Sequence, residues 1–221
     1  MKLIVFNGGG GKYNYSLGVL SVLQKNFDLS NCIFSGASSG SFIALLACIN
    51  YDADDFFQKW NLKLLNELND YKLGPILNWN SKIREFCKEF LDDDVLNKVN
   101  DKLYIQLTCV PYLNGTLISN WQNTSEIIDT LIATSFIPIF DYGYLTAKYN
   151  GKRYIDGGIS NNSPVPEVNY SKKLVIDPNK WRKLPKNSFW ALYGSEQPTQ
   201  LFEMGKKDAL DNLKEIKVIF E

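Results

Sequence analysis

Residues 32–49 read CIFSGASSGSFIALLACI, two apolar runs separated by a cluster of small residues. Cys32 to Ser35 is short and apolar, as expected of a buried strand. Gly36 to Gly40 predicts a tight turn, and Ser41 to Ile49 predicts a short, very apolar helix. We therefore expect this stretch to fold as strand, turn and helix.

The beginning of the chain repeats this plan. Lys2 to Phe6 is a β-branched and aromatic run, Asn7 to Gly11 is rich in glycine, and Leu17, Leu20 and Leu23 have helical spacing. Two strand-turn-helix units in succession predict an α/β fold with a mostly parallel central sheet covered by helices. The length of 221 residues suits a single domain covering residues 1–221.

Further along, helical patterns alternate with hairpins. Asp54 to Asn97 has a helical pattern with one apolar face and a break at Gly74-Pro75, so it could form a cap beside an active site. The other expected elements are a hairpin of Leu103 to Val110 with Gly115 to Ser119, a helix over Ser125 to Ser135, a hairpin of Tyr144 to Tyr149 with Lys152 to Ile155, a strand over Leu174 to Ile176, a helix over Thr199 to Leu213 and a last strand over Ile216 to Phe220.

The charge balance restricts the partners. Lysine plus arginine number 24, and aspartate plus glutamate also number 24, so no global field is available to hold a nucleic acid. Any membrane contact must therefore rest on apolar groups. The run from Lys2 to Phe6 meets glycines at once, which excludes a secretory signal or a membrane span there, and we expect the protein in the cytoplasm.

Histidine is absent, and this excludes any Ser-His-Asp triad. The cysteines lack C-x-x-C spacing and fall in apolar runs, so we expect reduced core thiols and neither a metal site nor a disulfide framework. These cysteines are Cys32, Cys48, Cys87 and Cys109. No cofactor is expected.

The turn after the second strand fits the pattern G-x-S-x-G, with Ser38 in the central position between Gly36 and Gly40. Such a turn lifts a serine oxygen clear of a sheet, and the following helix N-terminus stabilises nearby negative charge. The plainer alternative is an ordinary turn of small residues.

Gly8, Gly9, Gly10 and Gly11, followed by Lys12, could present backbone N–H groups to a phosphate or to an oxyanion. A P-loop would need glycine at Phe6 and serine or threonine at Tyr13, and a dinucleotide loop would need its last glycine at Tyr13. Both phosphate templates fail, whereas an oxyanion hole stays possible, as does a flexible turn.

Without histidine, a nucleophilic serine needs a carboxylate or a lysine as its base. Asp156 follows the expected strand Lys152 to Ile155, and Gly157 and Gly158 allow its carboxylate to approach another loop closely. The alternative is a turn of the Asp-Gly type.

These three pieces, in this order, resemble the patatin-like phospholipases. The family pattern is a glycine-rich loop with a basic residue, then G-x-S-x-G, then D-G-G or D-G-A. The stretch Leu103 to Pro164 is similar to the adiponutrin and adipose triglyceride lipase branch in particular. Two positions depart from the pattern, because Asn7 stands where many members have aspartate and Tyr13 where many have glycine.

The resemblance implies a three-layer α/β/α fold, Ser38 as nucleophile, Asp156 as general base, and amides around Gly9 and Gly10 as the oxyanion hole. Lys12 would match the basic residue after the loop. The implied partner is a lipid ester, met by transient contact with a membrane or lipid-droplet surface, and the oligomeric state stays open. Aromatic side chains that could dip into lipid, or simply pack in the core, are Trp60, Trp79, Trp121 and Tyr142.

The sequence therefore predicts a serine lipid acyl hydrolase with a Ser-Asp dyad, of the phospholipase, lysophospholipase or acylglycerol lipase type. An apolar acyl pocket could be lined by the helix after Ser38. A catalytically weak lipid-binding or regulatory protein with the same fold is the alternative.

Overall fold

The computed structural model describes residues 1–69, 79–92, 94–138, 143–192 and 194–221. The strands are β1 (Lys2–Phe6), β2 (Cys32–Ala37), β3 (Leu103–Cys109), β4 (Asn114–Ile118), β5 (Ala147–Tyr149), β6 (Lys152–Ile155) and β7 (Lys173–Ile176). The α-helices are α1 (Tyr13–Asn26), α2 (Ser39–Cys48), α3 (Ala53–Phe56), α4 (Leu62–Asn69), α5 (Trp79–Phe90), α6 (Val95–Val99), α7 (Thr124–Thr134), α8 (Glu196–Asp211) and α9 (Leu213–Phe220). Short 3₁₀ turns η1 (Gly10–Lys12), η4 (Gly157–Ile159) and η5 (Lys186–Trp190) and a π-helical turn η2 (Phe57–Asn61) complete the described elements.

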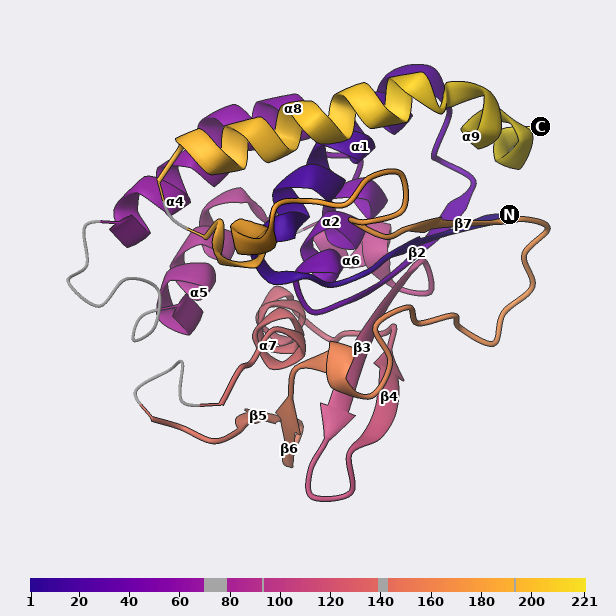
Figure 1. Ribbon diagram of the computed structural model, residues 1–221. Helices are drawn as coiled ribbons and strands as arrows, with labels where there is room; N and C mark the ends of the chain where they lie inside the picture. Colours follow the sequence, from indigo (N-terminus) through magenta and orange to yellow (C-terminus); the bar gives the residue numbers. More distant parts are fainter. Residues whose placement is uncertain (70–78, 93, 139–142, 193) are drawn as a thin grey trace.

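The strands form one sheet in the order β5-β6-β3-β2-β1-β7, with β4 paired to β3 (Figure 1). The pairs β1–β2, β1–β7 and β2–β3 are parallel, and β3–β4, β3–β6 and β5–β6 are antiparallel. The parallel part comes from the two strand-turn-helix units, because a parallel pair needs a crossover connection. The predicted α/β class is confirmed.

One edge of β3 is shared by two strands. Strand β2 pairs with β3 as far as Ala37–Gln106, and β6 pairs with it from Thr108–Ile155 onward. Strand β4 overlaps both pairings, so it must occupy the opposite edge. Because β2 runs parallel to β3 and β6 antiparallel to it, the C-terminal ends of β2 and β6 point at each other.

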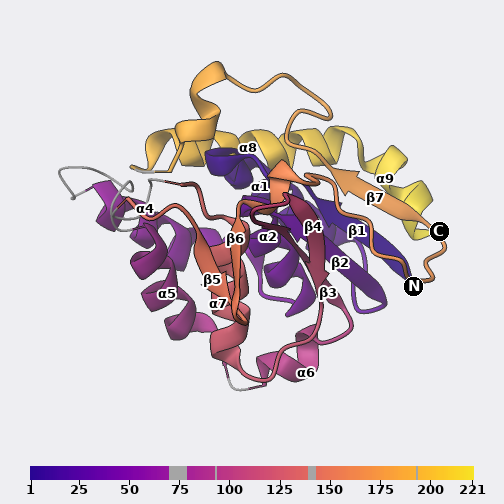
Figure 2. The ribbon, with the colours of Figure 1, turned by 90° about the horizontal axis from the view of Figure 1, so that it is seen from below.

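The two faces of the sheet are covered differently, as strand alternation allows. Ile4 and Phe6 of β1 belong to the large core beneath the helices, whereas Leu3 and Val5 face a smaller cluster on the other side. There the partly buried side chains include Val165, Val168 and Tyr170, which lie in the extended connection that leads to β7. Figure 2 views the same arrangement from below, with the two chain ends side by side.

Helices α1 and α8 pack together closely along the top of the molecule (Figure 1). Gly18 lies against α8, where a Cβ atom would come 2.0 Å from the Phe202 carbonyl oxygen. Gly205 lies against α1, where a Cβ atom would come 2.0 Å from the Tyr15 carbonyl oxygen. Two glycines thus set the distance between these helices, and α8 covers the helix that follows the glycine loop.

Most elements lie where the sequence places them, within a few residues. The expected last strand over Ile216 to Phe220 is wrong, because this segment is helix α9. A strand would put Ile216, Val218 and Phe220 on one face, yet Ile216 is fully buried and Val218 is 57% exposed. The spacing of Leu213, Ile216 and Phe220 suits a helix instead, and Phe220 stacks on Phe27. The predicted break at Gly74-Pro75 lies outside the described residues.

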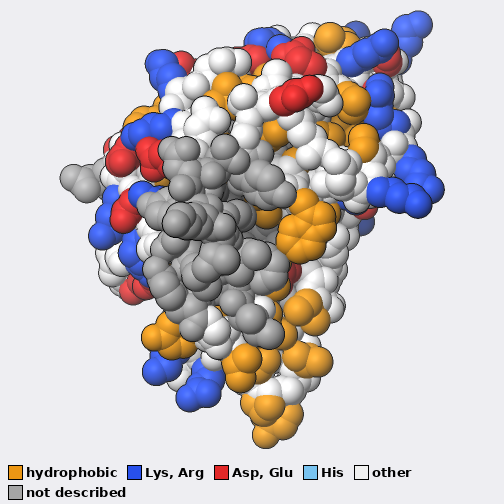
Figure 3. Space-filling view, turned by 60° about the vertical axis from the view of Figure 1, so that its left-hand side comes forward, with side chains coloured by type: hydrophobic (Ala, Val, Ile, Leu, Met, Phe, Trp, Pro, Cys, Tyr) orange, Lys and Arg blue, Asp and Glu red, His pale blue; other side chains and the backbone are white. Residues whose placement is uncertain are grey.

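Within the described parts of the chain, the helices are too short or too polar to span a bilayer. Exposed apolar side chains do occur, and Figure 3 shows orange side chains gathered at the lower end of the face that it presents, with blue side chains next to them.

Replacing Gly18 by alanine tests the close approach of α1 and α8. In an open helix, Gly→Ala raises the free energy of unfolding by roughly 0.5–1 kcal/mol. Here the Cβ must displace α8 backbone, so we expect Gly18→Ala to lower it by about 1–3 kcal/mol in urea unfolding. Gly205→Ala should behave alike. A stabilised Gly18→Ala protein would contradict this packing.

Candidate active site

Ser38 and Asp156 meet at the shared edge of β3. They are the next residues after Ala37 and Ile155, so the register brings both level with Leu107. The Ser38 hydroxyl donates a hydrogen bond to Asp156 Oδ2 at 2.5 Å. The sheet itself thus brings together two side chains that are 118 positions apart in the sequence.

Ser38 has a strained backbone. Its φ of 52° and ψ of −135° are unusual for a residue with a side chain, and such a conformation costs on the order of 1–3 kcal/mol. The Ser38 amide donates to Thr134 Oγ1 at 2.9 Å, and that hydroxyl donates to the Gln106 carbonyl at 2.6 Å. Helix α7 and strand β3 therefore hold the serine in the sharp turn that G-x-S-x-G predicts.

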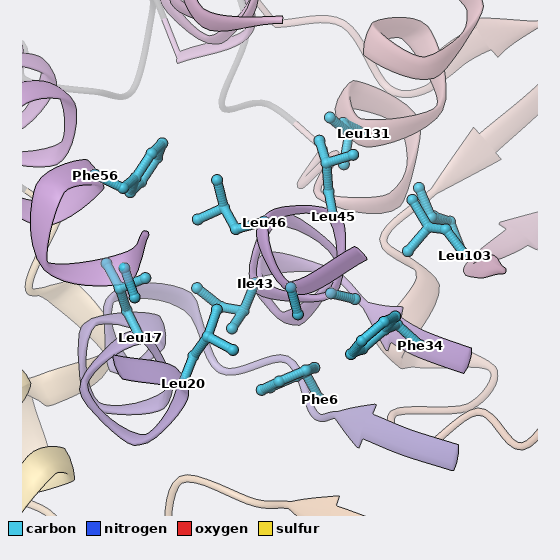
Figure 4. Packing of buried hydrophobic residues seen from close by; sticks show 14 of the residues in the cluster. Phe6, Leu17, Leu20, Phe34, Ile43, Leu45, Leu46, Phe56, Leu103 and Leu131 are labelled. Carbon is cyan, nitrogen blue, oxygen red and sulfur yellow. The ribbon is translucent and has the colours of Figure 1, made fainter. Parts of the chain in front are cut away.

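Helix α2 begins directly after Ser38 and is buried on all sides. Its side chains Ile43, Leu45 and Leu46 pack among residues of β1, β2, β3, α1, α3 and α7 (Figure 4). Gly40 lies under Phe6, where a Cβ would come 2.2 Å from the carbonyl oxygen, and Gly36 lies against Gly40. These two glycines permit the crossing of the first turn of α2 over β1, which fixes the height of the serine above the sheet.

Asp156 is held both at its carboxylate and at its backbone carbonyl. Its Oδ1 accepts from the Gly158 amide at 2.8 Å, and Thr108 Oγ1 donates to its backbone carbonyl at 2.8 Å. Gly157 lies so close to β3 that a Cβ would come 1.9 Å from the Gln106 carbonyl oxygen. Burial raises the pKa of Asp156 above its ordinary value, against the lowering effect of the bonds from Ser38 and Gly158.

The glycine loop lies against the serine. A Cβ on Gly8 would come 2.7 Å from the Ser38 Cβ, so glycine is required there. The Gly8 amide donates to Asn162 Oδ1 at 3.0 Å, and the Gly9 amide donates to Ser39 Oγ at 3.1 Å. Within the part of the chain that the structure describes, the amides of Gly10 and Gly11 have no partner. Gly10 also lines the same pocket as Ser38.

Lys12 ends the η1 turn and is half-buried beside Gly9. Its ammonium group makes no ion pair with any carboxylate of the described residues. The loop thus carries a cation that no carboxylate of the described residues neutralises, in the segment where the sequence predicts negative charge to develop.

A mainly apolar pocket of about 70 Å³ opens beside Ser38. Its walls come from α2, from η5, from the end of α7 and from the segment predicted as a cap, since Phe56, Leu64 and Ile83 lie on α3, α4 and α5. The other lining residues are Gly10, Tyr13, Ser39, Phe42, Ile43, Asn61, Asn80, Phe86, Ser135, Ile137, Phe189, Trp190 and Leu192. The predicted cap therefore forms part of the pocket wall.

A buried polar chain links this wall to the glycine loop. Tyr13 donates to Asn61 Oδ1, and Asn61 donates to Asn14 Oδ1 at 2.8 Å. Asn14 in turn donates to the carbonyls of Gly11 at 2.8 Å and Ala191 at 3.1 Å. Asn61 closes the π-helical turn η2, an irregularity that often marks functional positions.

These supporting residues could not be predicted from the sequence. Nothing in the pattern around Asn61, Thr134 or Asn162 distinguishes them from other polar residues, because their partners lie on distant elements. Asn14 offered a weak signal, since an amide in the first turn of a helix is well placed to bond the preceding backbone.

The aromatic candidates for lipid contact do not lie on the surface where they are described. Trp121 is buried and donates to Thr130, and Trp60 packs against Phe86 and donates to Tyr51. The alternative of a core or packing role holds for both. Tyr142 lies outside the described residues, and so does the side chain of Trp79.

The four cysteines are free, as expected. Burial raises the pKa of Cys32 to about 11 and those of Cys48 and Cys87 to about 12. Over the described ranges, no group of three His, Cys, Asp or Glu side chains could hold a metal ion.

With this geometry, comparison with known proteins assigns the chain to a family. The profile of the patatin-like phospholipase family matches residues 4–168. The chain therefore belongs to the patatin-like phospholipases, as its motifs predict.

Individual relatives are longer proteins. The chain is 38% identical over 93 residues to 1-acylglycerol-3-phosphate O-acyltransferase Pnpla3 of Mus musculus, which covers 42% of this chain and 22% of that protein. It is 30% identical over 171 residues to patatin-like phospholipase domain-containing protein 2 of Homo sapiens, covering 75% of this chain and 34% of that protein. The chain thus spans about a fifth to a third of the length of these relatives.

A solved structure supports the fold. VipD from Legionella pneumophila superimposes with a TM-score of 0.62 at 12% identity, covering 97% of this chain and 67% of that one. At this identity the likeness concerns the fold alone.

The raised pKa of Asp156 predicts that its ionised carboxylate lowers the stability of the folded protein at neutral pH. The Asp156 carboxyl group binds its proton more tightly in the folded state than in the unfolded state. Its contribution to the stability of the fold is therefore fully present below the pKa of the unfolded state and is lost as the pH rises through the pKa of the folded state. Asp156→Asn keeps the shape without the charge and should raise the thermal midpoint at neutral pH by about 2 °C or more. The gain should vanish near pH ~3.

The exposed Asp101→Asn serves as the control for this experiment and should change the midpoint little at any pH. An Asp156→Asn protein that is less stable than wild type at neutral pH would show that the ionised carboxylate stabilises the fold.

Proposed function

We propose that this protein is a serine lipid acyl hydrolase in which Ser38 is the nucleophile and Asp156 its general base. The observation that carries the proposal is the 2.5 Å hydrogen bond from the Ser38 hydroxyl to Asp156 Oδ2 beside a glycine loop and an apolar pocket. Membership of the patatin-like phospholipases supports action on lipid esters.

In the first step, Ser38 Oγ bonds to the ester carbonyl carbon while its proton passes to Asp156 Oδ2. The carbonyl oxygen becomes an oxyanion. The Gly10 amide is the proposed donor to this oxygen, together with the Ser39 amide that follows the nucleophile, and the N-terminus of α2 adds its dipole. In this arrangement Gly8 and Gly9 determine the shape of the loop, and Gly11 and Lys12 support it from the η1 turn.

In the second step, the C–O bond to the leaving alcohol breaks and Asp156 returns the proton to that alcohol. The acyl-enzyme remains on Ser38. Water then attacks it, giving one proton to Asp156, and the acid leaves as Ser38 regains that proton. The raised pKa of Asp156 suits this cycle, because a base with a pKa nearer to neutrality is also a better acid for the leaving group.

The pocket suits the acyl chain of a lipid. Its lining is mainly aliphatic and aromatic, and such a surface binds a hydrocarbon chain by removing it from water. Glycerophospholipids, lysophospholipids and acylglycerols all present such chains, and the described lining of the pocket has no charged side chain that would select one head group. Placement in the cytoplasm, with contact at membranes or lipid droplets, stays a prediction.

Transfer of the acyl group to an alcohol is a second candidate. One relative is named an O-acyltransferase, and an acyl-enzyme on Ser38 could be resolved by an alcohol in place of water. Products formed from a lipid ester with and without added monoacylglycerol separate the two outcomes.

Removal of either member of the dyad tests the proposal. Ser38→Ala and Asp156→Asn should each lower kcat/KM for a short acyl ester by about 10³-fold or more, because the two groups act as one unit. The double variant should be no worse than either alone. Activity within about tenfold of wild type in either variant would refute the assignment.

A fluorophosphonate probe tests the alternative of a catalytically weak lipid binder. Labelling requires an activated serine, so mass spectrometry should find the probe on Ser38 in wild type and strongly reduced labelling in Asp156→Asn. Ser125→Ala is the control, since Ser125 is an exposed serine at the start of α7 and its loss should not alter labelling. An unlabelled wild-type protein would favour the binder.

Narrowing the pocket should change the preferred chain length. Ile83 lines the pocket from α5, so Ile83→Phe should lower the ratio of laurate to butyrate ester hydrolysis by about tenfold. Ile128→Phe is the control, because Ile128 is equally buried on α7 but does not line the pocket. If both variants shift the ratio alike, the pocket does not bind the chain.

A further inference from the structure

Two pairs of apolar side chains protrude into solvent, one beyond the end of β3 and one before the start of β5. Tyr112 and Leu113 lie in the β3–β4 turn and are 80% and 52% exposed, and Tyr144 and Leu145 precede β5 and are 65% and 66% exposed. Single exposed apolar residues are ordinary, but apolar side chains gathered with cations on one hairpin usually mark an interaction site.

Two hairpins carry this surface side by side. Beyond the pairing of Cys109 with Tyr154, the Val110 amide donates to the Arg153 carbonyl at 3.0 Å. The tip of the β3–β4 hairpin therefore lies next to the beginning of β6. Strand β5 pairs with β6 in antiparallel register, so Tyr144 and Leu145 lie at the end of the β5–β6 hairpin that is nearer to Asp156, and the β3–β4 tip lies at the other end.

The β5–β6 hairpin, which lies between the two apolar pairs, carries three cations. Lys148, Lys152 and Arg153 are exposed, and none of them pairs with a carboxylate of the described residues. Lys148 lies directly opposite Arg153 in the pairing, an arrangement of like charges that lowers sheet stability. A lysine on the exposed edge of β5 would prevent this strand from pairing with a strand of another molecule. That role does not explain the exposed tyrosine and leucine side chains near it.

We propose that these seven residues form a membrane-docking surface that binds the face of an anionic phospholipid bilayer. Tyrosine and leucine side chains on loop tips enter the boundary between head groups and acyl chains, and lysine and arginine contact the anionic head groups. The residues of the docking surface are Tyr112, Leu113, Tyr144, Leu145, Lys148, Lys152 and Arg153.

The location of this docking surface fits the proposed function, on which the inference rests. Lys152 is the first residue of β6, and Asp156 directly follows this strand. Because an extended strand rises about 3.3 Å per residue, the docking surface begins about 13 Å from the dyad. The connection between α7 and β5 has Ile137 in the pocket wall and Leu145 on the docking surface. A lipid that leaves the bilayer here has a short path to Ser38.

Charge and shape favour a bilayer over a second copy of the chain. Two copies that met through this surface would bring Lys148, Lys152 and Arg153 against the same cations of the partner, because a twofold interface repeats each patch. Tyr112 and Leu113 lie on a hairpin tip, which suits insertion into a soft interface.

Vesicle sedimentation of the full chain carrying Ser38→Ala tests the proposal, since this variant binds lipid without consuming it. Binding to phosphatidylcholine vesicles with about one third phosphatidylserine should be at least tenfold tighter than to phosphatidylcholine alone, and should weaken as salt rises. Lys148→Glu/Lys152→Glu/Arg153→Glu should weaken anionic binding by about 100-fold or more. Leu113→Ser/Leu145→Ser should weaken binding to both kinds of vesicle.

The control carries the same charge change on exposed lysines of the η5 approach, α8 and α9, as Lys183→Glu/Lys207→Glu/Lys214→Glu, and should retain most of the anionic binding. Equal losses in the two triple variants, or equal binding of the parent to both vesicles at all salt concentrations, would overturn the proposal. So would a dimer in sedimentation velocity that Leu113→Ser/Leu145→Ser abolishes.

The salt titration needs no substitution in the docking surface. It therefore tests electrostatic binding to the anionic bilayer even if a surface variant fails to fold. Because the assay measures binding by a protein without its nucleophile, a negative result here is distinct from the absence of ester hydrolysis in the wild type.

Discussion

The site depends on one edge of β3 being shared by two strands that run toward each other. Strand β2 leaves this edge at Gln106 and β6 joins it at Thr108, so the next residue of each strand arrives at Leu107. Hydrogen bonds of a sheet fix strand position to a fraction of a residue, and a slip of one residue would turn every side chain to the other face. The distance between Ser38 and Asp156 is therefore set by backbone pairing, and the side chains need little adjustment to meet.

Keeping this arrangement costs stability at several places. Ser38 has a positive φ, the carboxylate of Asp156 is buried with a raised pKa, and Gly8, Gly40 and Gly157 are confined by neighbouring backbone or side chains. The buried apolar helix α2 and the bonds from Thr134 and Thr108 offset these costs by fixing what the turn alone would not hold. Strain gathered at one point of a well-packed fold is typical of a site whose geometry serves chemistry.

The sequence predicted the local features well and the long-range ones only through resemblance. Strand-turn-helix units were readable because apolar periodicity and glycine clusters act over a few residues, and both Ser38 and Asp156 stood at strand ends. The approach of β6 to β2 could not be predicted from the sequence, because the register between strands far apart in the chain leaves no local sequence pattern. The run Ile216 to Phe220 looked like a strand because its residues are β-formers, but packing on Phe27 made it helical. Asn61 and Asn162 were missed for the same reason as the register, and the single-domain organisation of residues 1–221 stays a prediction.

The most direct test of the account is a crystal structure of the protein after reaction with a fluorophosphonate. The account predicts phosphorus bonded to Ser38 Oγ, the Asp156 carboxylate within about 3 Å of that oxygen, and the phosphoryl oxygen accepting hydrogen bonds from the amides of Gly10 and Ser39. An adduct on another residue, or an adduct on Ser38 with the Asp156 carboxylate turned away and out of reach, would contradict it.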